Sequence, residues 1–203
     1  MKPAAARSGK LRMHKSKGKV RELESKLPEK LRGGPGIAHT RWATHGEPNA
    51  RSAHPHMGAS GDVVGVHNGI VENYAPLKAE LEAEGTHFNS ETDSEVIVHL
   101  VEHFQAAGDD LVTAARRAIQ QLRGAHGIVL LSSREPGRIV AARVGNAGGV
   151  VIGVGEGEMF LASSIPAFLR ETRCVQLIED GEIVALTADG ARFLDPVGEE
   201  LER

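Results

Sequence analysis

Apolar residues recur with helical spacing in three successive stretches in the middle of the chain. In the first stretch, over residues 74–84, Leu77 and Leu81 stand four apart and lie on one face of a helix. Asn73 precedes this stretch as a candidate N-cap, and Gly85 follows it as a terminator. The pattern predicts a short amphipathic helix.

The second and third stretches have the same pattern with clearer ends. Thr92 and Glu95 stand three apart before an apolar run, which is the spacing of a capping box, and Gly108 closes the run. Asp109 or Asp110 then opens a third helix that ends near Gly124. The residues expected to face the core are Val96, Ile97, Leu100, Val101, Phe104, Leu111, Ala115, Ala118, Ile119 and Leu122.

From residue 127 onward the periodicity changes to short β-rich runs. Seven such runs are separated by Gly, Asp and Pro, and Asp180-Gly181 and Asp189-Gly190 have the form of two-residue hairpin turns. Residues 62–71 read as strand, turn, strand, whereas residues 37–59 read as loops with a short strand. Strands, then helices together, then many strands indicate an α+β fold with antiparallel sheets.

Composition narrows the class of protein. The chain has 203 residues, 40% of them hydrophobic, and no apolar run approaches the roughly 20 residues that cross a bilayer. Residues 1–32 hold eleven Lys and Arg against three Glu, a net charge of +8, whereas residues 33–203 carry −11. No aromatic side chains interleave this basic lead-in, so a solvated arm, or an edge strand with a short helix, is favoured over a nucleic-acid site. We expect a cytoplasmic protein that binds neither nucleic acid nor membrane.

Cysteine and histidine give few other signals. The one cysteine, Cys174, lies in an alternating run and is expected to be a buried structural thiol. His99, Glu102 and His103 match an inverted zinc-protease pattern, and His54 with His56 forms a second candidate pair of ligands. The first set flanks an apolar stripe, and a proline separates the second pair. We therefore expect no metal site and no cofactor.

Three polar groups could bind or activate a small molecule. Arg41, with Thr44 and His45 close by, could hold a carboxylate, and the alternative is a strand end with Arg41 stacked on Trp42. The Asn68 side chain and the Gly69 N–H could stabilise an oxyanion, although Asn-Gly is also a hairpin signal.

Asp93 is the third candidate group. It could pair with a ligand ammonium or could compensate a helix dipole. When each of the three groups is considered alone, a structural role is favoured over a functional one.

Together these segments resemble one family. GIAHTRWATHGEPN (residues 36–49), AHPH (53–56), VGVHNGIVENY (64–74), SETDSEVIVHL (90–100) and QLRGAHG (121–127) resemble, in order, the glutaminase domain of glutamine–fructose-6-phosphate aminotransferases. This family belongs to the class II amidotransferases. The likeness extends from about residue 10 to residue 203.

The resemblance implies an N-terminal-nucleophile hydrolase fold, a four-layer αββα sandwich of antiparallel sheets between helices. It implies that Arg41, Thr44 and His45 hold the glutamine α-carboxylate and that Trp42 shapes the loop. It further implies that Asn68 and Gly69 form the oxyanion hole and that Asp93 binds the α-ammonium.

The resemblance departs at the start of the sequence. The family's nucleophile is a cysteine at the mature N-terminus, whereas this sequence begins Met1-Lys2-Pro3. We therefore expect a basic lead-in over residues 1–32 and an N-terminally truncated type-2 amidotransferase domain over residues 33–203. We also expect the first strand and helix to be missing and hydrolysis to be lost.

Three hypotheses for function remain. The chain is the glutaminase part of the enzyme, a glutamine-binding sensor or interaction module, or a fragment from a misplaced start. L-Glutamine and L-glutamate are the implied ligands, and sugar-phosphate isomerase domains are the implied partners. An uncovered sheet edge would favour a homodimer.

Overall fold

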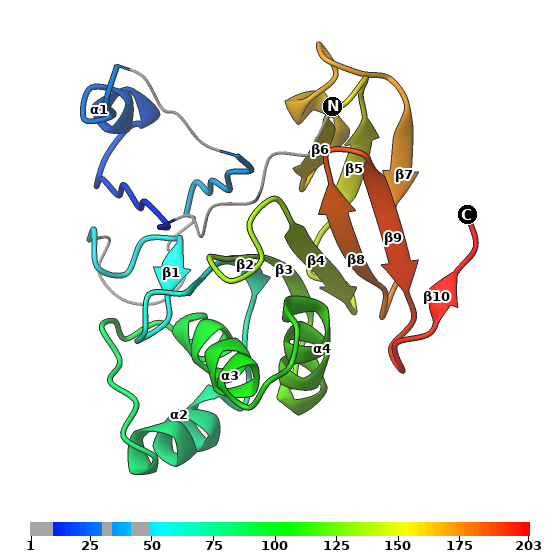
Figure 1. Cartoon of the computed structure of the whole chain (residues 1–203). Helices are drawn as coiled ribbons and strands as arrows, with labels where there is room; N and C mark the ends of the chain where they lie inside the picture. Colours follow the sequence, from blue (N-terminus) through cyan, green and yellow to red (C-terminus); the bar gives the residue numbers. More distant parts are fainter. Residues whose placement is uncertain (1–9, 30–33, 42–48) are drawn as a thin grey trace.

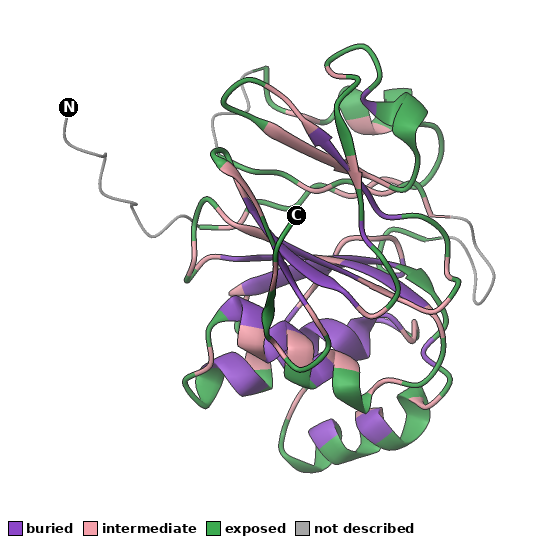
Figure 2. Cartoon of the chain, turned by 90° about the vertical axis from the view of Figure 1, so that its right-hand side faces the viewer, coloured by how far each residue is buried: buried purple, intermediate pink, exposed green. Residues whose placement is uncertain are grey.

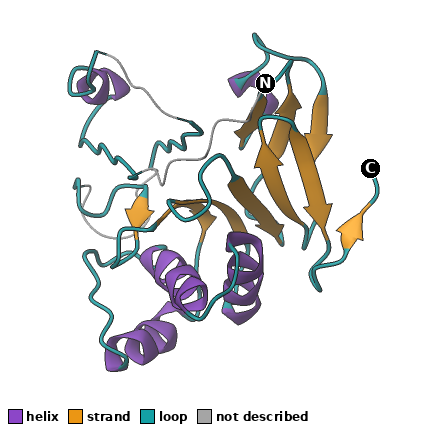
Figure 3. Ribbon diagram, in the orientation of Figure 1, coloured by secondary structure: helices purple, strands orange, loops and turns teal. Residues whose placement is uncertain are grey.

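The computed structural model describes residues 10–29, 34–41 and 49–203, and it contains two antiparallel sheets and one layer of helices (Figures 1 and 3). The large sheet has the order β1-β2-β3-β4-β8-β9-β10, and the small sheet has the order β6-β5-β7. Within the described ranges, no helix is long and apolar enough to span a membrane. The strands of the large sheet are β1 (His56–Met57), β2 (Val63–Gly69), β3 (His126–Ser132), β4 (Ile139–Val144), β8 (Ile183–Thr187), β9 (Gly190–Leu194) and β10 (Glu200–Leu201).

Three helices cover one face of the large sheet. They are α2 (Tyr74–Ala83), α3 (Glu95–Ala106) and α4 (Leu111–Gln121). Alternate residues of β2 and β3 point toward them, and Figure 2 shows the buried band that results between helices and sheet. Eight of the ten residues predicted to face the core are buried in it, and Ile119 and Leu122 are half-buried against it. The buried eight are Val96, Ile97, Leu100, Val101, Phe104, Leu111, Ala115 and Ala118. The predicted apolar stripes are therefore confirmed.

Helix α3 approaches β2 closely at Gly65. A Cβ at this position would lie 2.9 Å from a side-chain carbon of both Leu130 and Val98, so a larger residue would push the helix away from the sheet. This close packing fixes the N-terminus of α3 against the end of β2, where the candidate residues lie.

The small sheet packs on the other face of the large one. It consists of β6 (Met159–Ala162), β5 (Val151–Val154) and β7 (Val175–Leu177), with the 3-10 turn η1 (Ile165–Ala167) following β6. The α+β class with antiparallel sheets is confirmed. Of the four expected layers, the described residues form one helical layer and two sheets. The buried side chains between the sheets are Ala141, Val150, Ile152, Ile178, Val184, Leu186 and Phe193.

Long-range pairing overrides two of the local turn signals. Asp189-Gly190 does join paired strands, since Thr187 is opposite Gly190 in the β8–β9 hairpin. Asp180-Gly181, however, connects β7 of the small sheet to β8 of the large sheet, so the predicted hairpin there is wrong.

Residues 62–71 form one strand rather than two. Strand β2 pairs with β3, which lies beyond all three helices in the sequence.

The helix ends are close to prediction, but the caps differ. Asp110 caps α4 by accepting a hydrogen bond from the Thr113 N–H at 2.8 Å, as expected. Asn73 does not cap α2; its side chain instead bonds the backbone of residues 121 and 123. The predicted capping box is also wrong, because Glu95 accepts from the backbone N–H groups of residues 89 and 90 instead of Thr92.

Residues 10–29 contain the short helix α1 (Val20–Glu24), none of whose residues is buried. The lead-in contacts the domain through Lys15, whose ammonium donates to the carbonyl of Arg51 at 3.0 Å. In the described part of the lead-in, the helix expected from the sequence is present, but no edge strand is formed.

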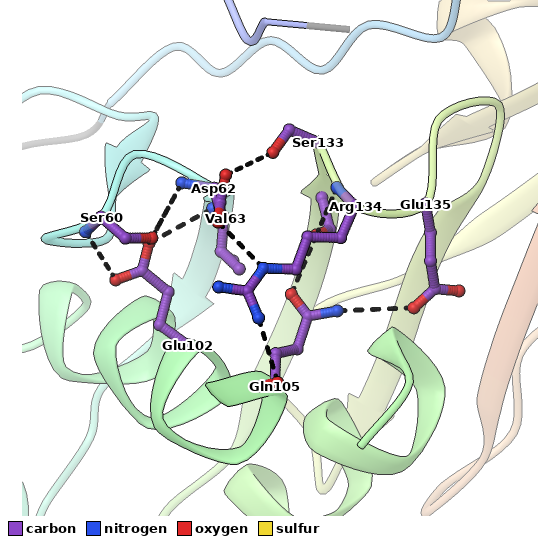
Figure 4. Close-up of polar contacts among 9 residues, drawn as sticks. Ser60, Asp62, Val63, Glu102, Gln105, Ser133, Arg134 and Glu135 are labelled. Atoms are coloured by element: carbon purple, nitrogen blue, oxygen red, sulfur yellow. Dashed lines mark hydrogen bonds and ion pairs between the residues drawn. The ribbon is translucent and has the colours of Figure 1, made fainter. Parts of the chain in front are cut away.

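Polar side chains connect the start of β2 to α3 at the end of the sheet away from the candidate site (Figure 4). The Glu102 carboxylate of α3 accepts from the Ser60 hydroxyl at 2.6 Å, the Ser60 N–H at 3.0 Å and the Asp62 N–H at 3.2 Å. Gly58 leaves room for this carboxylate, since a Cβ there would lie 2.1 Å from Glu102 Cδ. Glu102 therefore connects α3 to the turn before β2 by hydrogen bonds.

A neighbouring group continues the connection to the β3–β4 turn. Asp62 accepts from the Ser133 hydroxyl at 2.6 Å and from Arg134 Nε at 2.9 Å, and Arg134 also donates to the carbonyl of Gln105. Because these contacts join three segments that are distant in sequence, they fix the register of β2 against β3 at its first residues.

Replacing Glu102 by alanine removes the acceptor for these donors. We expect Glu102→Ala to lower the free energy of unfolding by about 1–3 kcal/mol, because several hydrogen bonds to one charged acceptor are lost together. Urea denaturation measures this change. Glu80→Ala, at an exposed position of α2, is the matched control and should change stability by less than about 0.5 kcal/mol. Equal stability of the two variants would show that the hydrogen bonds of Glu102 do not stabilise the domain.

Candidate functional site

The candidate oxyanion residues are the last two residues of β2. Asn68 lies opposite Gly127 and Gly69 lies opposite His126, so both are paired within the sheet. The interpretation of Asn68-Gly69 as a plain hairpin turn is therefore wrong. Both residues are exposed at this end of the strand, where they can meet a ligand.

The pleat of β2 places Asn68 on the face toward the small sheet. Val66 and Asn68 share one face, and Val129, which is opposite Val66, packs between the two sheets. Gly127 leaves space beside Asn68, since a Cβ there would lie 3.8 Å from Asn68 Cβ and 3.4 Å from a methyl of Val150.

Gly69 is required for two separate reasons. Its φ of +124° lies in a region that other residues avoid, and a Cβ would lie 2.0 Å from the carbonyl oxygen of Ala125. The backbone can therefore pass close to residue 125 only without a side chain at position 69. This passage fixes the direction in which the strand end presents its N–H.

Asp93 reaches the same strand end from the helix side. Its Oδ2 accepts a hydrogen bond from the Val71 N–H at 2.7 Å, two residues beyond the end of β2. The Ser94 hydroxyl donates to Oδ1 at a longer 3.4 Å. Asp93 thus has a short structural hydrogen bond on Oδ2 and only a long one on Oδ1, and it stands two residues before the first residue of α3.

The segment 39–41 lies against Asn68. Nε2 of His39 is 2.8 Å from Oδ1 of Asn68, and the His39 ring is 4.2 Å from that of His54, centre to centre. Arg41 is close enough to lower the pKa of both His54 and His56 by its charge, although burial contributes more. Trp42, Thr44 and His45, the other predicted site residues of this segment, lie outside the described residues.

A buried histidine pair lies directly behind the candidate residues, and no sequence signal identified it. Nε2 of His67 is 3.1 Å from Nδ1 of His126, and Nδ1 of His67 is 2.9 Å from the Ser94 hydroxyl. Burial, followed by the neighbouring His126, lowers the pKa of His67 to about 3. Alternation along β2 could have indicated that His67 points inward, but nothing indicated a second histidine opposite it.

A second buried polar group supports the loop that carries Asp93. His56 contacts the Thr92 hydroxyl at 3.1 Å, and Ser90 contacts both Thr92 and Glu95. Burial alone raises the pKa of Glu95, but hydrogen bonds from His99, Ser90 and Asn89 outweigh it and bring the pKa to about 2. This ionised carboxylate holds the loop in place.

The residues of the two metal patterns are used in other ways. His99 pairs with Glu95 at 3.3 Å, His103 with Glu84 at 3.2 Å, and Glu102 holds the turn before β2. His99 is buried, contrary to its expected position beside the stripe. Across residues 10–29, 34–41 and 49–203, no three His, Cys, Asp or Glu side chains are grouped as metal ligands.

Cys174 is exposed and free, so its prediction as a buried thiol is wrong. It precedes β7 in the small sheet, where its carbonyl accepts from the Val154 N–H at 2.9 Å. A surface hollow of roughly 640 Å³ opens beside it over residues 166 and 169–173 and includes no candidate site residue.

Comparisons with known proteins identify the family of this chain. A family profile described as "glutamine amidotransferase domain" matches residues 39–170, which include Arg41, Asn68, Gly69 and Asp93. The chain belongs to the glutamine amidotransferase family. The matched region also contains α3, β2 and β3, the elements that bring these residues together.

Two curated relatives of this amidotransferase domain are named glutamine–fructose-6-phosphate aminotransferase [isomerizing]. The protein of Methanothermobacter thermautotrophicus is 50% identical over 194 residues, 95% of this chain and 32% of its own length. That of Symbiobacterium thermophilum is 47% identical over 202 residues, 98% of this chain and 32% of its own length. The chain thus spans about a third of the length of these relatives.

Solved structures support the fold of the amidotransferase domain. Glutamine phosphoribosylpyrophosphate amidotransferase from B. subtilis aligns with a TM-score of 0.63 at 23% identity, over 78% of this chain and 34% of that one. A structure titled as the allosteric regulatory enzyme of purine biosynthesis gives 0.64 at 24% identity, over 78% and 34%. The N-terminal-nucleophile amidotransferase fold is therefore confirmed.

Replacing Gly69 by alanine should lower the stability of the domain more than the same replacement at another glycine of positive φ. We expect Gly69→Ala to destabilise the domain by more than about 2 kcal/mol, because backbone strain of about 1–3 kcal/mol adds to the overlap with Ala125. Gly85, with a φ of +93° and nothing within 4 Å of an added Cβ, isolates the strain alone. Thermal denaturation of both variants measures the difference, and equal losses would show that the close passage is unimportant.

The buried histidines predict a stability that falls in acid. Burial, followed by the charge of Lys15, lowers the pKa of His56 to about 4, and that of His67 is about 3, so the unfolded chain binds protons that the folded chain does not. Each histidine contributes fully to the free energy of unfolding above its unfolded pKa near 6.5. As the pH falls toward the folded pKa this contribution is lost, by about 2 kcal/mol per histidine between pH 7 and pH 5.

Urea denaturation at pH 7, 6 and 5 measures this loss. His67→Gln should make the free energy of unfolding fall less between pH 7 and pH 5, because one of the buried histidines is removed. His87→Gln, at an exposed position, should leave the pH dependence as in the parent chain. A free energy of unfolding that stays constant from pH 7 to pH 5 in the parent chain would contradict the prediction.

Proposed function

We propose that this chain supplies the glutamine-binding and oxyanion-stabilising groups of a glutaminase domain that feeds ammonia to fructose-6-phosphate. The observation that carries the proposal is the meeting of three segments at one end of β2: Asn68-Gly69 itself, Asp93 before α3, and the segment 39–41 against Asn68. The shared name of the relatives supports the choice of substrate and product.

Each group has a role that its chemistry allows. Arg41, with Thr44, His45 and the loop shaped by Trp42, binds the α-carboxylate of glutamine, and Asp93 binds the α-ammonium through the carboxylate side that does not hold Val71. Asn68 Nδ2 and the Gly69 N–H donate to the carbonyl oxygen of the side-chain amide. Donors on this oxygen favour nucleophilic attack because they stabilise the negative charge that develops there.

The reaction has two steps. A cysteine thiolate forms a C–S bond to the amide carbon, the C–N bond breaks, and the nitrogen leaves as ammonia after taking a proton. Water then hydrolyses the thioester, which regenerates the thiol and releases glutamate. The family resemblance assigns this thiolate to a mature N-terminal cysteine, and the cysteine of this sequence is Cys174 on the small sheet.

A second candidate function is glutamine binding without hydrolysis. The exposed position of Cys174, away from the contacts around Asn68, favours it for residues 1–203 on their own. The proposal also includes a cytoplasmic setting, and isomerase domains as the users of the ammonia, which the word "isomerizing" in the relatives' name suggests.

The two uses of Asp93 separate in a pair of variants. Asp93→Asn keeps an oxygen for the Val71 N–H but removes the charge that pairs with an ammonium, so L-glutamine binding should weaken about 10- to 100-fold at nearly unchanged stability. Asp93→Ala should lose both binding and stability. Isothermal titration calorimetry and thermal denaturation measure the two effects.

The exposed turn residue Asp189 provides the control, because Asp189→Asn should bind glutamine as the parent does. No binding by the parent chain at millimolar glutamine would refute the proposed ligand. An ammonia assay on the same sample distinguishes the two candidate functions: release at an ordinary enzymatic rate would reject binding alone.

A further inference from the structure

We propose that His39 is a positioning residue that fixes which end of the Asn68 side-chain amide faces the ligand. The inference rests on the proposed function, because it concerns the oxyanion group of that same site. It adds a residue from outside the strand end to the machinery and gives it a role distinct from binding the substrate.

The contact itself carries the argument. A side-chain amide has an acceptor end, Oδ1, and a donor end, Nδ2. Oδ1 of Asn68 lies 2.8 Å from Nε2 of His39, so His39 donates and the two N–H groups of Asn68 point away from it. Only this orientation presents donors to a developing oxyanion; the flipped amide would present an oxygen and repel it.

The surroundings of the His39 ring favour one of its two tautomers. In the Nε2–H tautomer, Nε2 donates and Nδ1 is an acceptor. Nδ1 is a buried atom with no hydrogen-bond partner in the described part of the chain. A buried acceptor without a partner is tolerated more readily than a buried N–H without one, so the observed surroundings favour the tautomer that donates to Asn68.

A row of three histidine rings in tilted and edge-to-face contact supports His39 in this position. Its ring lies 4.2 Å from that of His54, which lies 4.8 Å from that of His56, and His56 contacts Thr92 in the loop before α3. Burial, followed by the nearby histidines and Arg41, lowers the pKa of His54 to about 2, so the ring against His39 is uncharged at neutral pH. These ring contacts therefore connect Asn68 to the loop of Asp93, and the His54 ring in the middle adds no charge.

The first test needs no ligand. Nuclear magnetic resonance of the ¹⁵N-labelled chain reports the tautomer of His39 and the side-chain N–H signals of Asn68, assigned by their loss in Asn68→Asp. We expect the Nε2–H tautomer, and we expect the Asn68 signals to shift in His39→Leu but not in His87→Leu, whose position is exposed. An Nδ1–H tautomer of His39 would overturn the proposal.

The second test uses three ligands with the same α-carboxylate and α-ammonium. L-Glutamate and L-glutamine carry an oxygen that can reach Asn68, whereas L-norvaline carries none. His39→Leu should weaken L-glutamate at least about 10-fold, since a charged hydrogen bond is lost, and leave L-norvaline within about twofold. His39→Gln can still donate to Oδ1 and should restore L-glutamate binding to within about threefold of the parent.

These outcomes separate a positioning role from a structural one. Equal weakening of all three ligands by His39→Leu would show that His39 only supports the fold, and failure of His39→Gln to restore binding would exclude the hydrogen bond as the cause. If the parent chain bound none of the three, the proposed function would fail. The resonance experiment would still decide whether His39 orients Asn68.

Discussion

The antiparallel pairing of β2 with β3 is the interaction on which the rest of the structure depends. Its first residues are tied to α3 by Glu102, its middle packs against α3 at Gly65, and its last two residues are Asn68 and Gly69. A slip of one residue would exchange the faces of the strand. Asn68 would then point toward the helices, and His67 toward the small sheet.

This pairing also explains where local sequence signals succeed. The apolar stripes of the helices are properties of single segments. They could be predicted because the spacing of apolar residues along one segment shows which face of a helix is buried. The β8–β9 hairpin is local in the same sense. Asn68-Gly69 and Asp180-Gly181 carry equally good turn signals, but their strands pair with partners elsewhere in the sequence. Propensity alone does not encode those partners.

The candidate site divides in a similar way. The chemistry of Arg41, Asn68, Gly69 and Asp93 could be stated from residue types, and the family resemblance gathered them, whereas the groups that support them could not be foreseen. His67 meets His126 across 59 positions, and His39 meets Asn68 across 29. Such contacts depend on strand register and on the approach of α3. Cys174 was predicted incorrectly because an alternating run does not reveal which face of a small sheet is covered.

The buried polar groups around the end of β2 share one physical feature. They keep this end of the strand polar but mostly uncharged. Burial holds His54 and His67 neutral, and Glu95, the buried carboxylate, is compensated by hydrogen bonds. Uncharged histidines of this kind cost stability in acid, yet they add no positive charge beside the candidate groups Arg41 and Asp93. Their field is then less opposed by neighbouring charges and acts more strongly on a zwitterionic ligand than it would among charged histidines. The constraint that makes the fold sensitive to acid is therefore the same one that would suit this strand end to the α-amino acid proposed as its ligand.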